Sequence, residues 1–279
     1  MAKKCEGKTA VEWFDKGTKY IKHREIDLFK GEDYQKAIEC FERAVYIDPQ
    51  FKEAWFNMGS LHYVIFGHTE QAIDCFENAV QIDPQYKEAW YELGLIYEDM
   101  FNMHVSNTAL YQKYAQFLDP PDKQVDLHKS IECYEKVIQI DPNHTGAWVK
   151  MGTAHANSNN PEKAIECFEK AFQIDPRCKE ALFNMGGIQV ELGNLLAAIK
   201  CWEKAVQIAP KYKEAWYKMG VAYGDLANPR QAIECYKKAT QIDGQYKEAW
   251  HSMGLAYKRL GETKRADQCF ERAYRVTHH

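Results

Sequence analysis

The sequence lacks any apolar stretch close to the roughly 20 residues that a membrane-spanning helix needs. Its first residues, Met-Ala-Lys-Lys-Cys-Glu-Gly-Lys, also lack the apolar core of a secretory signal. We therefore expect no membrane insertion and a cytoplasmic location. In that compartment the nine cysteines should stay reduced and should not form a disulfide framework.

An excess of charge of either sign is also missing. The chain has 36 lysines and arginines against 40 aspartates and glutamates, which leaves a net charge of −4. A strongly basic chain would indicate nucleic acid or an acidic membrane surface as the partner, and this balance gives no such indication. We therefore expect no nucleic-acid partner.

Motifs that support catalysis are absent as well. The sequence has no Gly-x-x-x-x-Gly-Lys-Ser/Thr phosphate loop, no Gly-x-Ser-x-Gly nucleophile turn, no His-Glu-x-x-His zinc pair and no Gly-x-Gly-x-x-Gly dinucleotide fingerprint. Its ten histidines are scattered along the chain. The sequence therefore predicts neither an enzyme nor a bound metal or cofactor.

What the sequence has instead is internal repetition. Lys-Glu-Ala-Trp begins at Lys52, Lys87, Lys213 and Lys247, and Ile-Asp-Pro ends at Pro49, Pro84, Pro142 and Pro176. In the C-terminal half the period is 34 residues, as between Pro142 and Pro176. Within each unit apolar residues recur three and four positions apart, which is typical of helices. Each unit is therefore predicted to be a pair of amphipathic helices.

The second helix of a unit should begin at capping residues. Asn160 and Asn228 each precede a proline, which needs no amide donor at the first helical position. Thr69 and Asn194 occupy related positions, and we expect them to cap their helices in the same way. The helix should end at Asp-Pro, because a proline disfavours helical geometry for the residue before it.

These motifs together resemble the tetratricopeptide repeat, whose pattern is Trp-x-x-Leu-Gly-x-x-Tyr, then Ala-x-x-x-Phe, then Pro. Its first half is reproduced by Trp90, Leu93, Gly94 and Tyr97, and its second half by Ala164, Phe168, Ala171 and Pro176. The resemblance implies an all-α fold, a right-handed α-solenoid of about seven stacked helix-turn-helix units. The units are expected near residues 10–51, 52–86, 87–144, 145–178, 179–212, 213–246 and 247–279, in a single domain that spans residues 1–279.

One column of the repeat contains tryptophan. Six of the seven tryptophans occupy one helical position, at residues 13, 55, 90, 148, 216 and 250. A tryptophan can be a stacking platform for a ligand. Because the position is filled identically in nearly every unit, we interpret it as a packing position of the core.

Two further columns contain small residues. Glycine at 59, 94, 152, 186, 220 and 254 is expected to face the alanines of the second helix, where a larger side chain would clash. Seven cysteines share another column, at residues 40, 75, 133, 167, 201, 235 and 269. Equivalent stacked helices lie about 8–10 Å apart, which suits neither a disulfide nor a metal site. We interpret these cysteines as small apolar residues in a tight seam between helices.

Three units are longer than the rest, and each is lengthened between its two helices. The first has about eight extra residues between Tyr20 and Ala37, the second has one near Gly67, and the third contains an insertion at residues 98–127. Within that insertion Leu110, Tyr114 and Phe117 follow helical spacing. With Tyr111 they are expected to form a rim of the binding groove, although a packed elaboration without function explains them equally well.

The resemblance implies that the first helices line a concave groove that binds peptides or helices of other proteins. The candidates are the groove-facing residues that vary between units: Phe56, Asn57, Ser60, Tyr91, Glu92, Leu95, Lys150, Thr153, Asn184, Tyr217, Lys218, Val221, His251 and Leu255. Asn57 and Asn184 can also be explained as consensus residues of the family. The expected function is that of a non-catalytic scaffold or adaptor.

Two other functions stay open at this point. No unit follows the last predicted helix to cover Phe270 and Tyr274, so self-association through the C-terminal repeat, or polymerisation through repeat ends, is an alternative. Some helical repeats bind RNA, but the tryptophan, glycine and tyrosine columns argue against that function.

Overall fold

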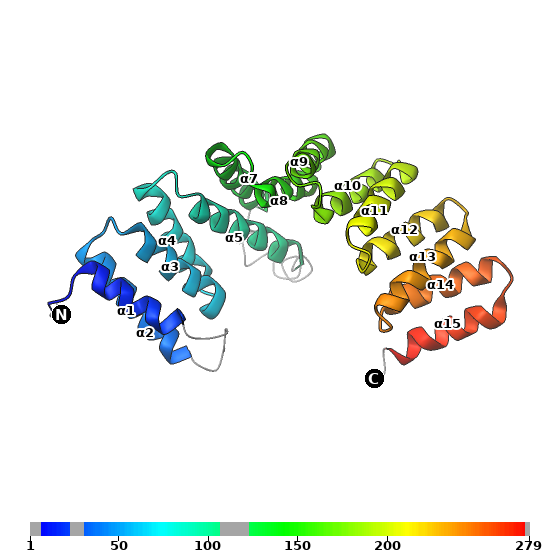
Figure 1. Cartoon of the computed structure of the whole chain (residues 1–279), viewed down its shortest axis with the longest axis horizontal. Helices are drawn as coiled ribbons and strands as arrows, with labels where there is room; N and C mark the ends of the chain where they lie inside the picture. Colours follow the sequence, from blue (N-terminus) through cyan, green and yellow to red (C-terminus); the bar gives the residue numbers. More distant parts are fainter. Residues whose placement is uncertain (1–6, 23–30, 107–122, 277–279) are drawn as a thin grey trace, which may run out of the picture. The chain divides into compact units, whose positions relative to one another are not determined.

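The computed structural model describes residues 7–22, 31–106 and 123–276. In these residues the regular secondary structure consists of fourteen α-helices and one π-helical turn, arranged as successive pairs (Figure 1). The fold is therefore an all-α repeat solenoid. The chain divides into two compact units, Met1–Ala147 and Trp148–His279, and each is described by itself. That residues 1–279 form a single domain stays a prediction.

The first unit contains three helix pairs. They are α1 (Ala10–Lys22) with α2 (Gly31–Ile47), α3 (Lys52–Leu61) with α4 (Thr69–Ile82), and α5 (Lys87–Ser106) with α7 (Lys123–Ile140). The π-helical turn η2 (His62–Phe66) continues α3. Each pair packs together, and α2 also packs on α3, as α4 does on α5.

The second unit begins inside α8 (Thr145–Asn157) and continues with regular pairs. The further helices are α9 (Pro161–Ile174), α10 (Lys179–Glu191), α11 (Leu195–Ile208), α12 (Lys213–Asp225), α13 (Pro229–Ile242), α14 (Lys247–Arg259) and α15 (Thr263–Arg275). The first helices of the pairs begin at the residues where the sequence repeats were expected to begin, from Ala10 and Lys52 to Lys213 and Lys247.

Each pair closes where a glycine of the first helix meets an aromatic ring of the second. A Cβ atom added to Gly94 would lie 2.6 Å from the ring of Tyr134, and one added to Gly220 would lie 2.5 Å from the ring of Tyr236. Real Cβ atoms essentially never approach a neighbour so closely, so these positions require glycine. The sequence predicted the small residue correctly, and the structure shows that the atoms nearest to it belong to the aromatic column, which the sequence had not indicated.

In three repeats the lysine that begins the first helix forms an ion pair with the aspartate that follows the second helix. The Nζ atom of Lys87 lies 2.7 Å from Oδ2 of Asp141, and that of Lys213 lies 2.6 Å from Oδ2 of Asp243. The hydrogen bond from Lys213 lowers the pKa of Asp243. In the repeat of α10 and α11, Ala209 occupies the position of this aspartate, so Lys179 has no aspartate partner at that position.

We expect Ala209→Asp to stabilise the protein by about 0.5–1 kcal/mol. The backbone at Ala209 (φ −129°, ψ 84°) resembles that at Asp243 (φ −132°, ψ 102°), so the new side chain can adopt the same geometry. It would accept a backbone hydrogen bond two residues ahead, as Asp243 does from Gln245 at 2.8 Å, and it would pair with Lys179. Urea denaturation followed by circular dichroism measures the gain. Ala209→Asn offers the hydrogen bond without the charge, and an equal gain from it would rule out a contribution of the ion pair.

The tryptophan column packs into the repeats, but less deeply than expected. Trp13 is 1% exposed, whereas Trp55, Trp90, Trp216 and Trp250 are only half-buried. Each of these four donates its Nε1–H to the backbone carbonyl six residues earlier, at 2.9–3.1 Å. The polar edge of the ring is therefore satisfied while part of the ring stays exposed.

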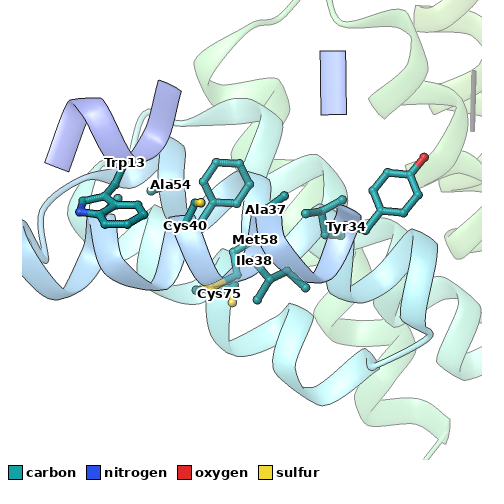
Figure 2. Packing of buried hydrophobic residues seen from close by; sticks show 11 residues of the cluster. Trp13, Tyr34, Ala37, Ile38, Cys40, Ala54, Met58 and Cys75 are labelled. Atoms are coloured by element: carbon teal, nitrogen blue, oxygen red, sulfur yellow. The ribbon is translucent and has the colours of Figure 1, made fainter. Parts of the chain in front are cut away.

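The cysteines lie among apolar side chains. Cys40 and Cys75 belong to the same core cluster as Met58 and Ile38 (Figure 2). None of the eight cysteines in the described part of the chain forms a disulfide, and all but Cys201 are buried. The structure thus places them as small apolar packing residues.

Two of the four expected helix caps are present. The Oδ1 atom of Asn160 accepts a hydrogen bond from the amide of Lys163 at 3.3 Å, and Asn228 does the same for Gln231 at 3.4 Å. The other two predictions were wrong. Thr69 is already the first helical residue, and Asn194 donates its side-chain amide to Gln189 instead of capping the helix.

In the second and third lengthened repeats, the described extra residues lie in helices. The single extra residue of the second repeat lies in the π-helical turn η2, just before Gly67, where the sequence had placed it. Gly67 then ends the turn with φ 65°. In the third repeat α5 continues to Ser106, and α7 begins at Lys123. The described ends of insertion 98–127 therefore extend the two helices of the pair.

The outer face of α15 is polar. In six second helices an isoleucine directly follows the residue of the alanine column, as Ile199 and Ile233 do. In α15 this position holds Asp267, which is exposed. Phe270 is half-buried, and Tyr274 is 64% exposed. Because an aspartate at this position opposes the apolar packing used between repeats, the expected self-association through this helix receives no support from it and stays a prediction.

Candidate functional site

The fourteen groove candidates all lie on first helices, as the sequence predicted. Phe56, Asn57 and Ser60 are on α3; Tyr91, Glu92 and Leu95 on α5; Lys150 and Thr153 on α8; Asn184 on α10; Tyr217, Lys218 and Val221 on α12; His251 and Leu255 on α14. They lie about 100° or more around each first helix from the tryptophan position, which is Leu182 in α10, because one residue corresponds to about 100° of helical rotation. We call this the first-helix surface. Its role in binding is a proposal.

The aromatic candidates of the first unit are held between other rings. The ring centroid of Phe56 lies 5.5 Å from that of Phe76 on α4 and 5.2 Å from that of Tyr86 in the following turn. Tyr91 has the same environment, 5.9 Å from Tyr134 and 5.0 Å from His144. These distances are typical of stabilising aromatic pairs. The two candidates therefore hold their units together and offer only part of their surface to a ligand.

The second unit repeats this arrangement. Tyr217 lies 5.9 Å from Tyr236 and 5.2 Å from Tyr246, and His251 lies 5.5 Å from Phe270. The same position in α10 is Phe183, which sequence reasoning missed and which lies 5.0 Å from Tyr212. A signal for these pairs was present, since an aromatic residue directly precedes the Lys-Glu-Ala motif in several units.

The polar candidates of the first unit are tied to their own helix. Asn57 donates its side-chain amide to the carbonyl of Glu53 at 2.7 Å, and Ser60 donates its hydroxyl to the carbonyl of Phe56 at 3.0 Å. Glu92 is half-buried, and burial raises the pKa of its carboxyl group. Leu95, three residues after Glu92 on α5, is also half-buried. This part of the surface is neutral to acidic.

The polar candidates of the second unit connect neighbouring helices. Thr153 of α8 donates its hydroxyl to the carbonyl of Val149 at 3.1 Å and accepts a hydrogen bond from the side-chain amide of Asn184 of α10 at 3.5 Å. Lys218 is exposed on α12, and Lys150 is half-buried.

Two further candidates of the second compact unit are apolar. Val221 is half-buried on α12, and Leu255 is 45% exposed on α14. The first-helix surface of the second unit therefore combines amide, hydroxyl and ammonium groups with apolar side chains. This is the mixture that a peptide-binding surface needs, because a peptide presents both backbone polar groups and side chains.

Some expectations fall outside the structure. The predicted rim residues Leu110, Tyr111, Tyr114 and Phe117 lie outside the described residues. Among residues 7–22, 31–106 and 123–276 no group of three or more histidine, cysteine, aspartate or glutamate side chains is placed to hold a metal ion. In the same ranges no helix is long and apolar enough to cross a membrane.

Family profiles agree with the repeat pattern. Profiles described as TPR repeat or tetratricopeptide repeat match residues 27–65, 66–100, 123–144, 146–178, 186–226, 214–246 and 247–277. A comparison with curated protein sequences finds no match.

Three solved structures with the same fold differ in their sequence identity to this chain and in how much of it they cover. The crystal structure of MamA is 29% identical, with a TM-score of 0.52 over 58% of this chain and 96% of MamA. YrrB, described as a TPR protein with an unusual peptide-binding site, is 19% identical, with a TM-score of 0.56 over 77% of this chain and 98% of its own.

The third is a tetratricopeptide repeat protein from Parabacteroides merdae. It is 13% identical, with a TM-score of 0.64 over 96% of this chain and 93% of its own. At their low identities this protein and YrrB show the fold alone. The helix pairs, the glycine and aromatic columns and the profile matches along most of the sequence agree with one another, and the chain belongs to the tetratricopeptide repeat family.

Proposed function

We propose that this protein is a non-catalytic interaction scaffold that binds peptide or helical segments of other proteins on its first-helix surface. The observation that supports this most is the composition of this surface in the second compact unit: Asn184 is hydrogen-bonded to Thr153, and the first helices α12 and α14 carry Lys218, Val221 and the exposed Leu255. Asn184 and Lys218 hold equivalent positions on α10 and α12, two residues after the conserved tryptophan position.

The chemistry of this arrangement fits an extended peptide. The amide of Asn184 can donate to a backbone carbonyl, and the ammonium group of Lys218 can bind a carbonyl or a carboxylate. Val221 and Leu255 can receive an apolar side chain of the ligand. Because the helices are already packed, binding requires little ordering of the protein, which favours affinity.

We expect the double substitution of Asn184→Ala and Lys218→Ala to weaken peptide binding by at least about tenfold, since each lost hydrogen bond to a ligand contributes about 1 kcal/mol or more. The ligand for this test is the tightest peptide selected from a random library on the full chain. Fluorescence anisotropy measures its dissociation constant for each variant. Lys204→Ala, an exposed lysine on α11, is the matched control and should leave affinity unchanged.

An equal affinity of the double variant and the original chain would contradict the proposal, provided that both show the same helical circular dichroism. Self-assembly through repeat ends is the second candidate, and the exposed Asp267 gives it no support. A mass that rises with concentration in ultracentrifugation would favour it. The cytoplasmic location and the lack of a nucleic-acid partner stay predictions from the sequence.

A further inference from the structure

Depressions recur on the side of the first helices opposite to the first-helix surface. Each lies between two successive second helices, and its floor is formed by the tryptophan, the following methionine or leucine, and the tyrosine of the first helix between them. One lies over α5, with a volume of about 640 Å³; one lies over α12, with about 380 Å³; and one lies over α14, with about 400 Å³. Volumes of this size suit a large side chain with its flanking backbone.

The floors are rigid and partly apolar. In the depression over α14, Met253 and Tyr257 are 3% and 8% exposed, and Trp250 is half-buried. The Nε1–H of Trp250 donates to the carbonyl of Gly244 at 2.9 Å, so the polar edge of the indole is already satisfied. The remaining ring surface is suited to apolar and aromatic contact with a ligand.

The three depressions differ in charge. Carboxylates and lysines both line the one over α5, and Glu203 and Glu234 line the one over α12 together with Lys238. The one over α14 is lined by Lys237, Arg265 and Arg272, with no carboxylate in its lining. It is therefore the depression that favours an anionic ligand.

The three cations are engaged to different degrees. Lys237 pairs with Glu234 at 2.7 Å, and Arg265 pairs with Glu262 at 2.6 Å, so their charge is partly neutralised. The guanidinium of Arg272 lies 5.2 Å from the ring centroid of Trp250, and no ion pair joins it to a carboxylate of the described residues. Arg272 can therefore form a bidentate pair with a ligand carboxylate while it stays stacked on the indole.

We propose that the depression between α13 and α15, over α14, is a second docking site, which binds an acidic peptide segment that carries one large apolar side chain. The apolar side chain packs on Trp250 and Met253, and flanking carboxylates pair with Arg272 and with the rim cations. A peptide fits better than RNA, because the cations gather in one local depression and do not form a long basic stripe, and because the chain as a whole is negative, with a net charge of −4. This site is separate from the first-helix surface and does not depend on the function proposed above.

The experiment uses the full chain and a fluorescein-labelled peptide of nine residues, in which a central phenylalanine has four aspartates or glutamates on each side. A second probe has asparagine and glutamine in place of the acidic residues. We expect saturable binding of the acidic probe and at least about tenfold weaker binding of the neutral one. Arg272→Glu should weaken binding of the acidic probe at least tenfold. Lys238→Glu, at the equivalent position one repeat earlier, is the matched control and should change affinity less than threefold.

Variants of the other surface distinguish the two proposals. The double substitution of Asn184→Ala and Lys218→Ala should leave affinity for the acidic probe unchanged. If it abolishes binding while Arg272→Glu does not, the docking site over α14 is refuted and the first-helix surface is supported. Equal binding of the acidic and neutral probes, or no saturation up to 200 μM of protein (roughly 5 kcal/mol of binding free energy), also overturns the docking site. Tighter, Arg272-dependent binding of polyuridylic acid would overturn the assignment to a peptide.

Discussion

Gly186→Ala is expected to destabilise the protein by about 1–3 kcal/mol, whereas Gly187→Ala, one residue further along α10, is expected to be neutral or to stabilise it by up to about 1 kcal/mol. A Cβ atom on Gly186 would overlap the indole of Trp202, which is 2% exposed and cannot move outward. A Cβ atom on Gly187 would meet no heavy atom within 4 Å. The two substitutions add the same methyl group to the same helix, so helix propensity cancels in the comparison.

Trp202 is further fixed by a hydrogen bond. Its Nε1–H donates to the carbonyl of Phe183 at 3.0 Å, so a shift of the indole away from a new methyl group would also strain this bond. Urea denaturation followed by circular dichroism measures both variants. Equal midpoints for Gly186→Ala and Gly187→Ala would show that the helix pair is not closed by the glycine and the aromatic ring.

The second large effect concerns thiol chemistry. At pH 8 the cysteines of the native chain should react with a disulfide reagent at least about 100-fold more slowly than those of the unfolded chain. Burial raises the pKa of Cys75, Cys133 and Cys235 from 9.0 to about 12, which lowers the thiolate fraction, and the same burial restricts access of the reagent. Cys201 is half-buried and should be the first of the column to react.

The measurement compares reaction rates in buffer and in denaturing urea. Because Cys5 lies outside the described residues, the experiment uses a chain with Cys5→Ser, and Cys201→Ser in that background should remove the fastest remaining reaction. Rapid reaction of several thiols in the native chain would show that the cysteine column is accessible and not a packing seam.

The same pKa shifts give the direction of a pH effect on stability. A thiol whose pKa is higher in the folded than in the unfolded protein stabilises the folded state while it stays neutral. This contribution is fully present below the unfolded-state pKa, near 9, and is lost as the pH rises toward 12. The sign follows from burial, since the folded state holds the proton more tightly.

Much of the fold follows from the sequence because the period is strict in the C-terminal half. A unit of 34 residues fixes where each helix begins, as Lys179 and Lys213 show, and the glycine column fixes where the two helices of a pair meet. The cap at Asn160 follows from its proline neighbour. The missing cap at Asn194 could not be foreseen, because the side chain has an alternative partner in Gln189 that only the folded turn brings close.

Other features depend on three-dimensional packing that a pattern does not contain. One extra residue can lengthen a loop or form a π-helical turn, and the sequence around Gly67 does not distinguish the two. A column of tryptophans indicates packing, but not that Trp250 leaves part of its ring exposed in a depression. The polarity of the outer face of α15 was recognisable in Asp267, at a position that holds isoleucine in the other six units.

The sequence placed the candidates on first helices, and their role in binding stays a prediction. Tyr217 and Lys218 both lie on α12, as the pattern predicted, but the structure gives the two side chains different environments. Tyr217 is held between Tyr236 and Tyr246, whereas Lys218 is exposed. Neighbouring candidates thus differ in role, because only the side chain that points toward the next turn gains ring partners.

The most direct test of the central claim is to locate a bound peptide on the protein. A photoreactive phenylalanine derivative is placed at Lys218 on the first-helix surface or at Lys204 on the second helix α11, and the peptide selected on the full chain is added before irradiation. We predict a cross-link from position 218 that excess unlabelled peptide suppresses, and none from position 204. A cross-link from position 204 alone would contradict binding on the first-helix surface.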